Sequence, residues 1–227
     1  MEYIKIQEYR NRLMAVVEMA YNLLCQKIAA ESISIFNEAS LQLHLGTILK
    51  SLGQLYEFSS EDHFVIELEK PFYKVVTSKS NNAARCDIVI SFKRGGKDMA
   101  QAFIELKYFK ASLDPKSAEA TKDNRFGLFM DLENLETYRD ASSAQIELPL
   151  CYEIALAQNG TYANPAAISS LKTGNGCWTD QSRTLDDMDD RLLVRYAKRK
   201  PIHLRGNYKF EWSSYANNKH SLIIRLQ

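Results

Sequence analysis

Three ionisable residues lie where apolar residues are expected, in two stretches whose composition is typical of β-strands. Glu105 and Lys107 interrupt the apolar run AFIELKYF, and Asp87 directly precedes the apolar run IVI. Because side chains alternate along a strand, Glu105 and Lys107 should project from the same face. Burying such charges is costly unless they are paired or bind a metal ion. The pattern therefore indicates a catalytic or metal-binding site.

A hairpin would bring these residues together. Gly95 and Gly96 separate the two stretches, and a turn there would place Asp87 beside Glu105. Two carboxylates with an open position between them suit a hard divalent cation such as Mg²⁺. With an adjacent ammonium, such a cation can activate water and neutralise negative charge that develops during hydrolysis. The alternative is that Glu105 and Lys107 lie on the solvent face of an edge strand.

The elements that must position these residues are indicated by changes in hydrophobic periodicity. Apolar spacings of three and four predict helices over about 3–30 and about 35–52, the second ending at Gly53. The period then falls to about two, which predicts successive strands. The expected strands are 64–72, 73–78, 86–92 and 102–109, followed by a helix over 124–140, a strand over 148–160, a helix over 184–201 and strands over 208–214 and 221–227. We therefore predict a mixed α/β fold in which helices flank a central sheet.

Asp87, followed by Glu105 and Lys107 in the order helix, strands, helix, strand, resembles the PD-(D/E)XK nuclease superfamily. Its best-known members are type II restriction endonucleases. The resemblance covers about residues 36–158 and implies a restriction-endonuclease-like core. It also implies that Asp87, Glu105 and the main-chain carbonyl of Leu106 ligate Mg²⁺, for which Mn²⁺ can substitute. Lys107 would position or polarise the attacking water.

Two further positions bear on this resemblance. Members of the family often add an acid on the helix before the strands. Glu38 in FNEASLQLHLG is available for that role, with Gln42 one turn later on the same face. The proline that precedes the aspartate in the family is replaced here by Cys86.

Composition restricts the class of protein. The 227 residues include 29 Lys plus Arg, 28 Asp plus Glu and 45% hydrophobic residues, which excludes a disordered tail or a collagen-like repeat. The four cysteines lack paired spacing, which excludes a disulfide scaffold, and we expect them to be small buried residues. No stretch approaches the ~18 apolar residues of a membrane span, and the first residues do not resemble a targeting peptide. We therefore expect a cytoplasmic protein with no membrane partner.

Charge is unevenly distributed along the chain. Residues 191–227 contain nine Lys or Arg and one acid, a charge of +8, so the remainder carries −7. This asymmetry is typical of a polyanion-binding surface on an acidic protein, although a solvated basic face would look the same. We expect DNA contacts from bases in this tail and from bases that follow the catalytic strand. These are Lys110, Lys122, Arg125, Lys198, Arg199, Lys200 and Arg205.

These observations predict a single nuclease domain over 1–227. Residues 1–34 would form a helix available for dimerisation, 35–160 the catalytic core, and 161–227 a basic extension that contacts DNA. The leading hypothesis is a Mg²⁺-dependent type II restriction endonuclease that cuts double-stranded DNA as a homodimer. A cognate DNA methyltransferase would be its functional partner without binding it directly. Two alternatives remain: a structure-specific nuclease of repair or recombination, and a non-catalytic nucleic-acid-binding protein with the same fold.

Overall fold

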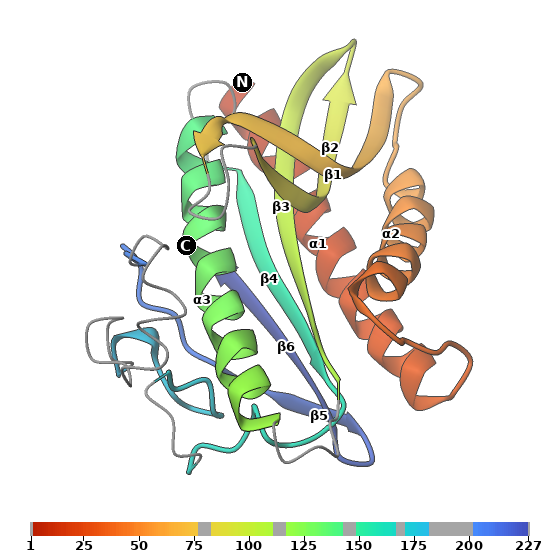
Figure 1. Cartoon of the computed structure of the whole chain (residues 1–227). Helices are drawn as coiled ribbons and strands as arrows, with labels where there is room; N and C mark the ends of the chain where they lie inside the picture. Colours follow the sequence, from red (N-terminus) through yellow and green to blue (C-terminus); the bar gives the residue numbers. More distant parts are fainter. Residues whose placement is uncertain are drawn as a thin grey trace.

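A six-stranded sheet forms the centre of the computed structural model of this chain, and α-helices cover both of its faces (Figure 1). The structure describes residues 2–76, 83–110, 117–142, 149–166, 171–181 and 202–226. The elements, in chain order, are α1 (Glu2–Ala29), α2 (Glu38–Leu55), β1 (Asp62–Val76), β2 (Ala83–Arg94), β3 (Lys97–Phe109), α3 (Ser117–Ser142), β4 (Leu150–Ala157), the 3₁₀ turn η1 (Thr179–Gln181), β5 (Ser213–Ala216) and β6 (Lys219–Leu226). The predicted mixed α/β architecture is confirmed.

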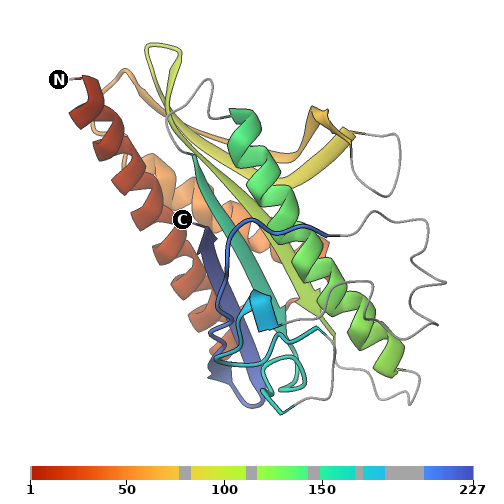
Figure 2. The same cartoon turned by 90° about the vertical axis from the view of Figure 1, so that its left-hand side faces the viewer.

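The strand order of the sheet is β1-β2-β3-β4-β6-β5. β1, β2 and β3 form an antiparallel meander, whereas β4 runs parallel to β3. A parallel neighbour requires a crossover connection, and α3 supplies it by running across one face of the sheet (Figure 2). In this strand order, β3 and β4 are central strands with a neighbour on each side.

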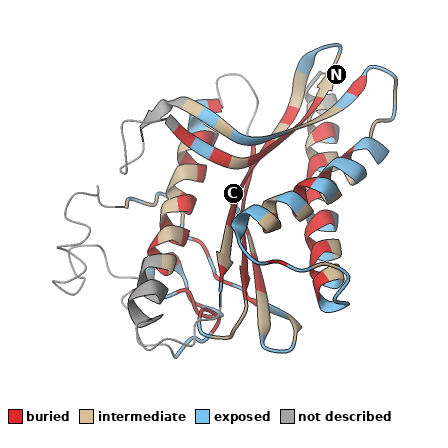
Figure 3. Ribbon diagram, turned by 45° about the vertical axis from the view of Figure 1, so that its right-hand side comes forward, coloured by how far each residue is buried: buried red, intermediate tan, exposed pale blue. Residues whose placement is uncertain are grey.

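The sheet separates two hydrophobic cores. Ile104 and Leu106 of β3 pack under α1 and α2, whereas Phe103 and Phe109 pack under α3. The buried residues accordingly run along the middle of the sheet, and the outer surface of α2 is exposed (Figure 3). Because the side chains of β3 alternate, Glu105 and Lys107 project toward the α3 face.

The first helix agrees closely with its prediction, and its apolar stripe packs inside the fold. Tyr9, Leu13, Val17, Leu24 and Ile28 are all buried in the core beneath α1. The outward face of α1 is mostly polar, with exposed Glu8, Asn11, Glu18, Asn22 and Gln26. A dimer formed through this helix would have to use that polar face.

The second helix does not end at Gly53, as the sequence predicted, but continues to Leu55. Gly53 is buried, and a Cβ atom there would overlap the ring of Phe64. The glycine therefore serves the close approach of α2 to β1 and does not terminate the helix. At the other end, the Asn37 side chain caps the helix by accepting a hydrogen bond from the main-chain N of Ser40.

The stretches 64–72 and 73–78, predicted as two strands, are one strand as far as Val76. Pro71 lies within β1 and pairs with Arg85 of β2. A proline is tolerated there because β1 is the edge strand of the sheet. The predicted turn between β2 and β3 is confirmed, since Gly95 and Gly96 have φ values of +55° and +80°.

The last described residues of the chain belong to the central sheet. β6 pairs with β4 on one side and with β5 on the other. Of the strand predicted over 208–214, only Ser213 and Ser214 belong to β5, while Lys209 forms an isolated bridge with Trp178. The helix predicted over 184–201 lies outside the described residues. In the part of the chain that the structure describes, none of the helices has both the length and the apolar character of a membrane span.

Candidate active site

β2 and β3 separate at Asp87, and the side chain of Asp87 bridges the gap. The ladder between the two strands runs from Arg94 and Lys97 to Ile88 and Ile104 and goes no further. Beyond it, Asp87 Oδ2 accepts a hydrogen bond of 2.7 Å from the main-chain N of Leu106. This bond holds the Asp87 carboxylate against the segment of β3 that carries Glu105 and Lys107. The structure thus brings together the three residues that the sequence singled out.

Glu105 and Lys107 lie on a central strand beneath α3. Glu105 is 4% exposed, and the Lys107 side chain is 20% exposed. The alternative of a charged pair on the solvent face of an edge strand is therefore wrong.

Carboxylates surround the ammonium of Lys107. It forms an ion pair with Asp131 of α3 and lies 3.7 Å from Glu38 Oε1 of α2. Burial alone would lower the pKa of Lys107, but Asp131, Glu38 and Glu153 raise it well above its usual value. Lys107 is therefore a fixed positive charge, suited to stabilising an anion and not to accepting a proton.

Two acids in this region were not identified from the sequence. Asp131 lies on the buried face of α3, and Glu153 lies at the centre of β4 with no exposed surface. Glu153 is the register partner of Glu105 in the parallel ladder between β3 and β4. The signal for Glu153 was present, because it interrupts a strand whose other residues are apolar or aromatic. We call Glu38, Asp87, Glu105, Asp131 and Glu153 the carboxylate cluster.

The carboxylate cluster strongly shifts the ionisation of its members. Burial raises the pKa of Asp87 to about 6, although the hydrogen bond from Leu106 N opposes the shift. Burial, followed by the charges of Asp131 and other acids, raises the pKa values of Glu105 and Glu153 well above their usual range. These shifts arise because Glu105 and Glu153 are buried close to other acids, while Lys107 opposes the shifts only in part. Strongly perturbed acids grouped in this way are typical of functional sites.

The cluster reaches solvent at the start of α2. Glu38 is the first residue of that helix, and its side chain is 53% exposed. Gln42, one turn later, donates hydrogen bonds to the main-chain O of Asp87 at 2.7 Å and to Glu69 Oε1 at 3.1 Å. The amide of Gln42 therefore ties α2 to β1 and β2 and keeps Glu38 near Lys107.

The carboxylate oxygens of the cluster are the type of donor that a hard divalent cation prefers. Among the described residues, no group of three or more His, Cys, Asp or Glu side chains is arranged to hold a metal ion. Mg²⁺, however, commonly binds through one or two carboxylates and completes its shell with water and substrate phosphates. Within the described part of the chain, Glu105 Oε1 and both carboxylate oxygens of Glu153 are buried without a hydrogen-bond partner. The carbonyl of Leu106, an expected ligand, lies 3.4 Å from Lys107 Nζ.

Arg125 does not face a DNA surface, which corrects its predicted role. It is 3% exposed, and its guanidinium donates hydrogen bonds to Leu171 O at 3.1 Å and Thr161 O at 2.9 Å. Arg125 thus joins α3 to the loop that follows β4. The positive charge of Arg125 therefore lies inside the protein, beside these carbonyl groups.

The structure describes some of the other predicted DNA contacts and not others. Lys110 is exposed at the end of β3. Lys122 lies on α3 with its side chain outside the described residues, and Lys198, Arg199 and Lys200 are outside them altogether. Arg205 is half exposed but pairs with Glu136 and Asp140.

Other bases in the described part of the tail also have acidic neighbours. Lys209 lies 2.6 Å from Glu211, and Arg225 lies 3.6 Å from Glu18. Much of the positive charge in this part of the tail is therefore matched locally.

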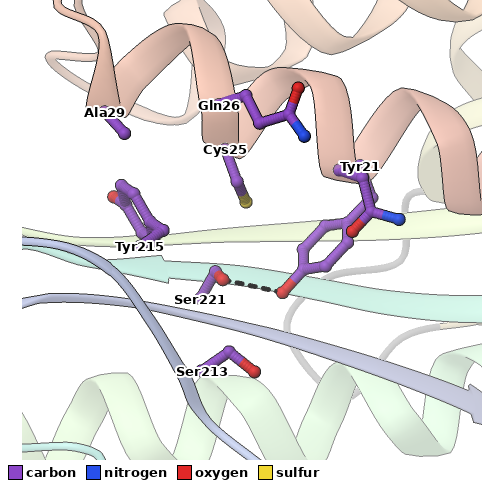
Figure 4. Close-up of a pocket in the computed structure, with 8 residues that line it drawn as sticks. Tyr21, Cys25, Gln26, Ala29, Ser213, Tyr215 and Ser221 are labelled. Atoms are coloured by element: carbon purple, nitrogen blue, oxygen red, sulfur yellow. Dashed lines mark hydrogen bonds between the residues drawn. The ribbon is translucent and has the colours of Figure 1, made fainter.

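A groove lies on the opposite face of the sheet from the cluster. It has a volume of about 300 Å³ and is lined by residues of α1, β5 and β6 (Figure 4). Tyr21 and Ser221 meet across it through a hydrogen bond of 2.7 Å. Because α1 and α3 cover different faces of the sheet, this groove is not part of the candidate active site.

Comparison of the chain with protein-family models, curated proteins and solved structures finds no match.

Proposed function

We propose that this protein is a DNA endonuclease that depends on a divalent cation, and that it acts as a type II restriction enzyme. The observation that carries the proposal is the 2.7 Å hydrogen bond from Leu106 N to Asp87 Oδ2. It holds the aspartate beside Glu105 and Lys107, the two residues with which it forms the pattern of the PD-(D/E)XK superfamily. The order α2, β1 to β3, α3 and β4 supports a restriction-endonuclease-like core.

The residues of the site have complementary roles in this proposal. Asp87 and Glu105 would hold Mg²⁺, with Glu38 at the exposed end of the cluster. When bound, the cation would supply a nucleophilic water and neutralise phosphate charge. Lys107 would stabilise the negative charge that grows on the phosphate oxygens, because its neighbours keep it protonated.

The surroundings indicate how DNA would reach the site. The cluster reaches solvent beside Glu38 and Lys107, so a phosphate would approach from the start of α2. Lys110 is exposed directly after the last residue of β3 and would contact the DNA backbone. Cutting both strands of a short duplex target requires two copies of the site, hence a homodimer. A cognate DNA methyltransferase would protect the host's own copies of the target.

The direct test is to incubate the purified protein with unmethylated phage DNA and Mg²⁺ and to sequence the fragment ends. We expect discrete fragments with a common end sequence. Asp87→Asn and Glu105→Gln should each reduce cleavage by at least about 100-fold while the protein stays folded. Glu67→Gln, which changes an exposed acid of β1, is the matched control and should cleave normally.

Other outcomes would distinguish the alternatives. A smear, or cleavage of flaps and junctions alone, would support a structure-specific nuclease. DNA binding by folded protein without cleavage in Mg²⁺ or Mn²⁺ would support a non-catalytic nucleic-acid-binding protein. Full cleavage by Asp87→Asn or Glu105→Gln would contradict the assignment of the site.

A further inference from the structure

Glu153 lies at the middle of β4, directly beside Glu105 of β3. Residues 102–109 of β3 pair one to one with residues 150–157 of β4, and Glu105 is opposite Glu153. Neighbouring strands are about 4.8 Å apart and partners project from the same face, so these two carboxylates share the face covered by α3. Like charges placed directly opposite each other destabilise a sheet unless another charge compensates them.

Among the described residues, no hydrogen bond offsets the cost of burying the Glu153 carboxylate. Its side chain has no exposed surface, and neither carboxylate oxygen has a hydrogen-bond partner in the described part of the chain. Glu105 Oε1 is in the same situation. An apolar side chain of similar size at position 153 would fill this space without the cost of burying a carboxylate. Among the described residues, no hydrogen bond therefore explains why a carboxylate is buried at this position.

The charged neighbours of Glu153 are mostly acids. Asp131, Asp87 and Glu38 all act on it unfavourably, and Lys107 is the base among the described groups that act on it most strongly. That lysine is already paired with Asp131 and lies 3.7 Å from Glu38. With every group ionised, the carboxylate cluster and Lys107 together carry a charge of −4. A divalent cation would offset half of that charge.

We infer that Glu153 is a further ligand of the divalent cation, so that Glu105 and Glu153 hold the cation as a pair of carboxylates across β3 and β4. The inference rests on the proposed function for the identity of the cation. It extends that function by adding a ligand from β4 to the residues of β2 and β3. Oxygen donors of this kind are those that Mg²⁺ and Mn²⁺ prefer.

The test measures cation binding directly, without DNA. Mn²⁺ is titrated into the full-length protein, and free Mn²⁺ is followed by electron paramagnetic resonance. We expect Glu153→Gln to weaken Mn²⁺ binding at least 10-fold. Glu211→Gln, which removes an exposed acid outside the cluster, should bind Mn²⁺ as the wild type does.

Thermal unfolding separates a ligand from a structural residue. In EDTA, Glu153→Gln should have about the same Tm as the wild type, because burial raises the pKa of Glu153 and favours its neutral form, and glutamine is a neutral group of the same size. In Mg²⁺ the wild-type Tm should rise, since a ligand that binds only the folded state stabilises it, and this rise should be smaller in Glu153→Gln. A structural Glu153 would give the reverse pattern: a lower Tm in EDTA and unchanged Mn²⁺ affinity.

Each remaining outcome overturns the inference. Wild-type affinity for Mn²⁺ in folded Glu153→Gln would exclude Glu153 as a ligand. Failure of both Glu153→Gln and Glu153→Leu to fold would show that the carboxylate is structural. A wild-type protein that binds no Mn²⁺ at millimolar concentrations would overturn both this inference and the proposed function.

The two proposals can fail separately. Mn²⁺ binding that depends on Glu153, without cleavage of any DNA, would reject the nuclease and keep the ligand assignment. Normal Mg²⁺-dependent DNA cleavage by the wild type, with unchanged Mn²⁺ affinity in Glu153→Gln, would reject the ligand assignment and keep the nuclease.

Discussion

The ammonium of Lys107 on β3 forms an ion pair with the carboxylate of Asp131 on α3, and Glu38 of α2 lies 3.7 Å from the same nitrogen. One side chain of the sheet therefore contacts a helix from each of the two layers. The ion pair fixes the direction of the ammonium, and the surrounding carboxylates keep it charged. Removing either member would change the charge balance of the whole cluster.

Lys107→Met should lower the free energy of unfolding by about 3–5 kcal/mol at pH 8 in EDTA, because the buried carboxylates lose their ammonium. Adding Asp131→Asn to this variant should recover part of that loss, since one of the uncompensated acids is removed. Urea denaturation of the two single variants and the double variant measures the coupling. Lys70→Met, which breaks an exposed pair with Glu67, should cost at most about 1 kcal/mol. Strictly additive effects of the Lys107 and Asp131 variants would contradict the described pairing.

The protein without cations should lose stability as the pH rises from about 4 to about 6. Asp87 has a usual pKa of 3.8 and a folded-state pKa of about 6. Between these values the folded state binds the extra proton, so the free energy of unfolding falls with increasing pH. Glu105 and Glu153 are shifted in the same direction and continue the trend to higher pH.

Asp87→Asn isolates the contribution of this carboxyl. The variant should lose less stability over the same pH range, by about 3 kcal/mol for a shift of this size. Urea denaturation in EDTA at intervals between pH 4 and pH 8 provides the measurement. Glu67→Gln should follow the wild-type curve, because its carboxylate is exposed. A wild-type curve that rises between pH 4 and pH 6 would contradict the described burial of Asp87.

Arg125→Lys should destabilise the protein by about 2–4 kcal/mol, because lysine cannot donate to both carbonyl groups that the guanidinium joins. The DNA affinity of the folded variant should equal that of the wild type, since Arg125 is buried. Lys110→Ala should behave in the opposite way, with unchanged stability and weaker, less salt-dependent DNA binding. Thermal unfolding and fluorescence anisotropy at several salt concentrations distinguish the two. A DNA-binding defect in folded Arg125→Lys would restore the role predicted from the sequence.

Gly53→Ala should destabilise the protein by about 1–3 kcal/mol, although alanine favours helices, because its Cβ would overlap the Phe64 ring. Gly46→Ala on the same helix should be neutral or stabilising by up to about 1 kcal/mol, since its Cβ would meet Ile66 and Leu68 at an ordinary 3.7 Å. Phe64→Leu should relieve the Gly53→Ala defect. Equal effects of the two alanine substitutions in thermal unfolding would contradict the described packing of α2 on β1.

Local patterns predicted the elements well where a single periodicity dominated. The apolar spacing of α1 and α2 and the glycines between β2 and β3 were sufficient, because each is a short-range property of the chain. Predictions failed where a distant contact decided the role of a residue. Gly53 was read as a helix end but accommodates Phe64, and Arg125 was read as a DNA contact but binds carbonyl groups of a remote loop.

For the candidate site, the sequence by itself determined that Glu105 and Lys107 share a face, because alternation along a strand needs no tertiary information. Only the tertiary structure decided that this face is buried beneath α3, that Asp131 pairs with Lys107, and that Glu153 lies beside Glu105. The physical reason is that strand register and helix packing are set by the fit of complete elements to one another. The spacing of residues along one strand carries no information about which acid of another element will face it.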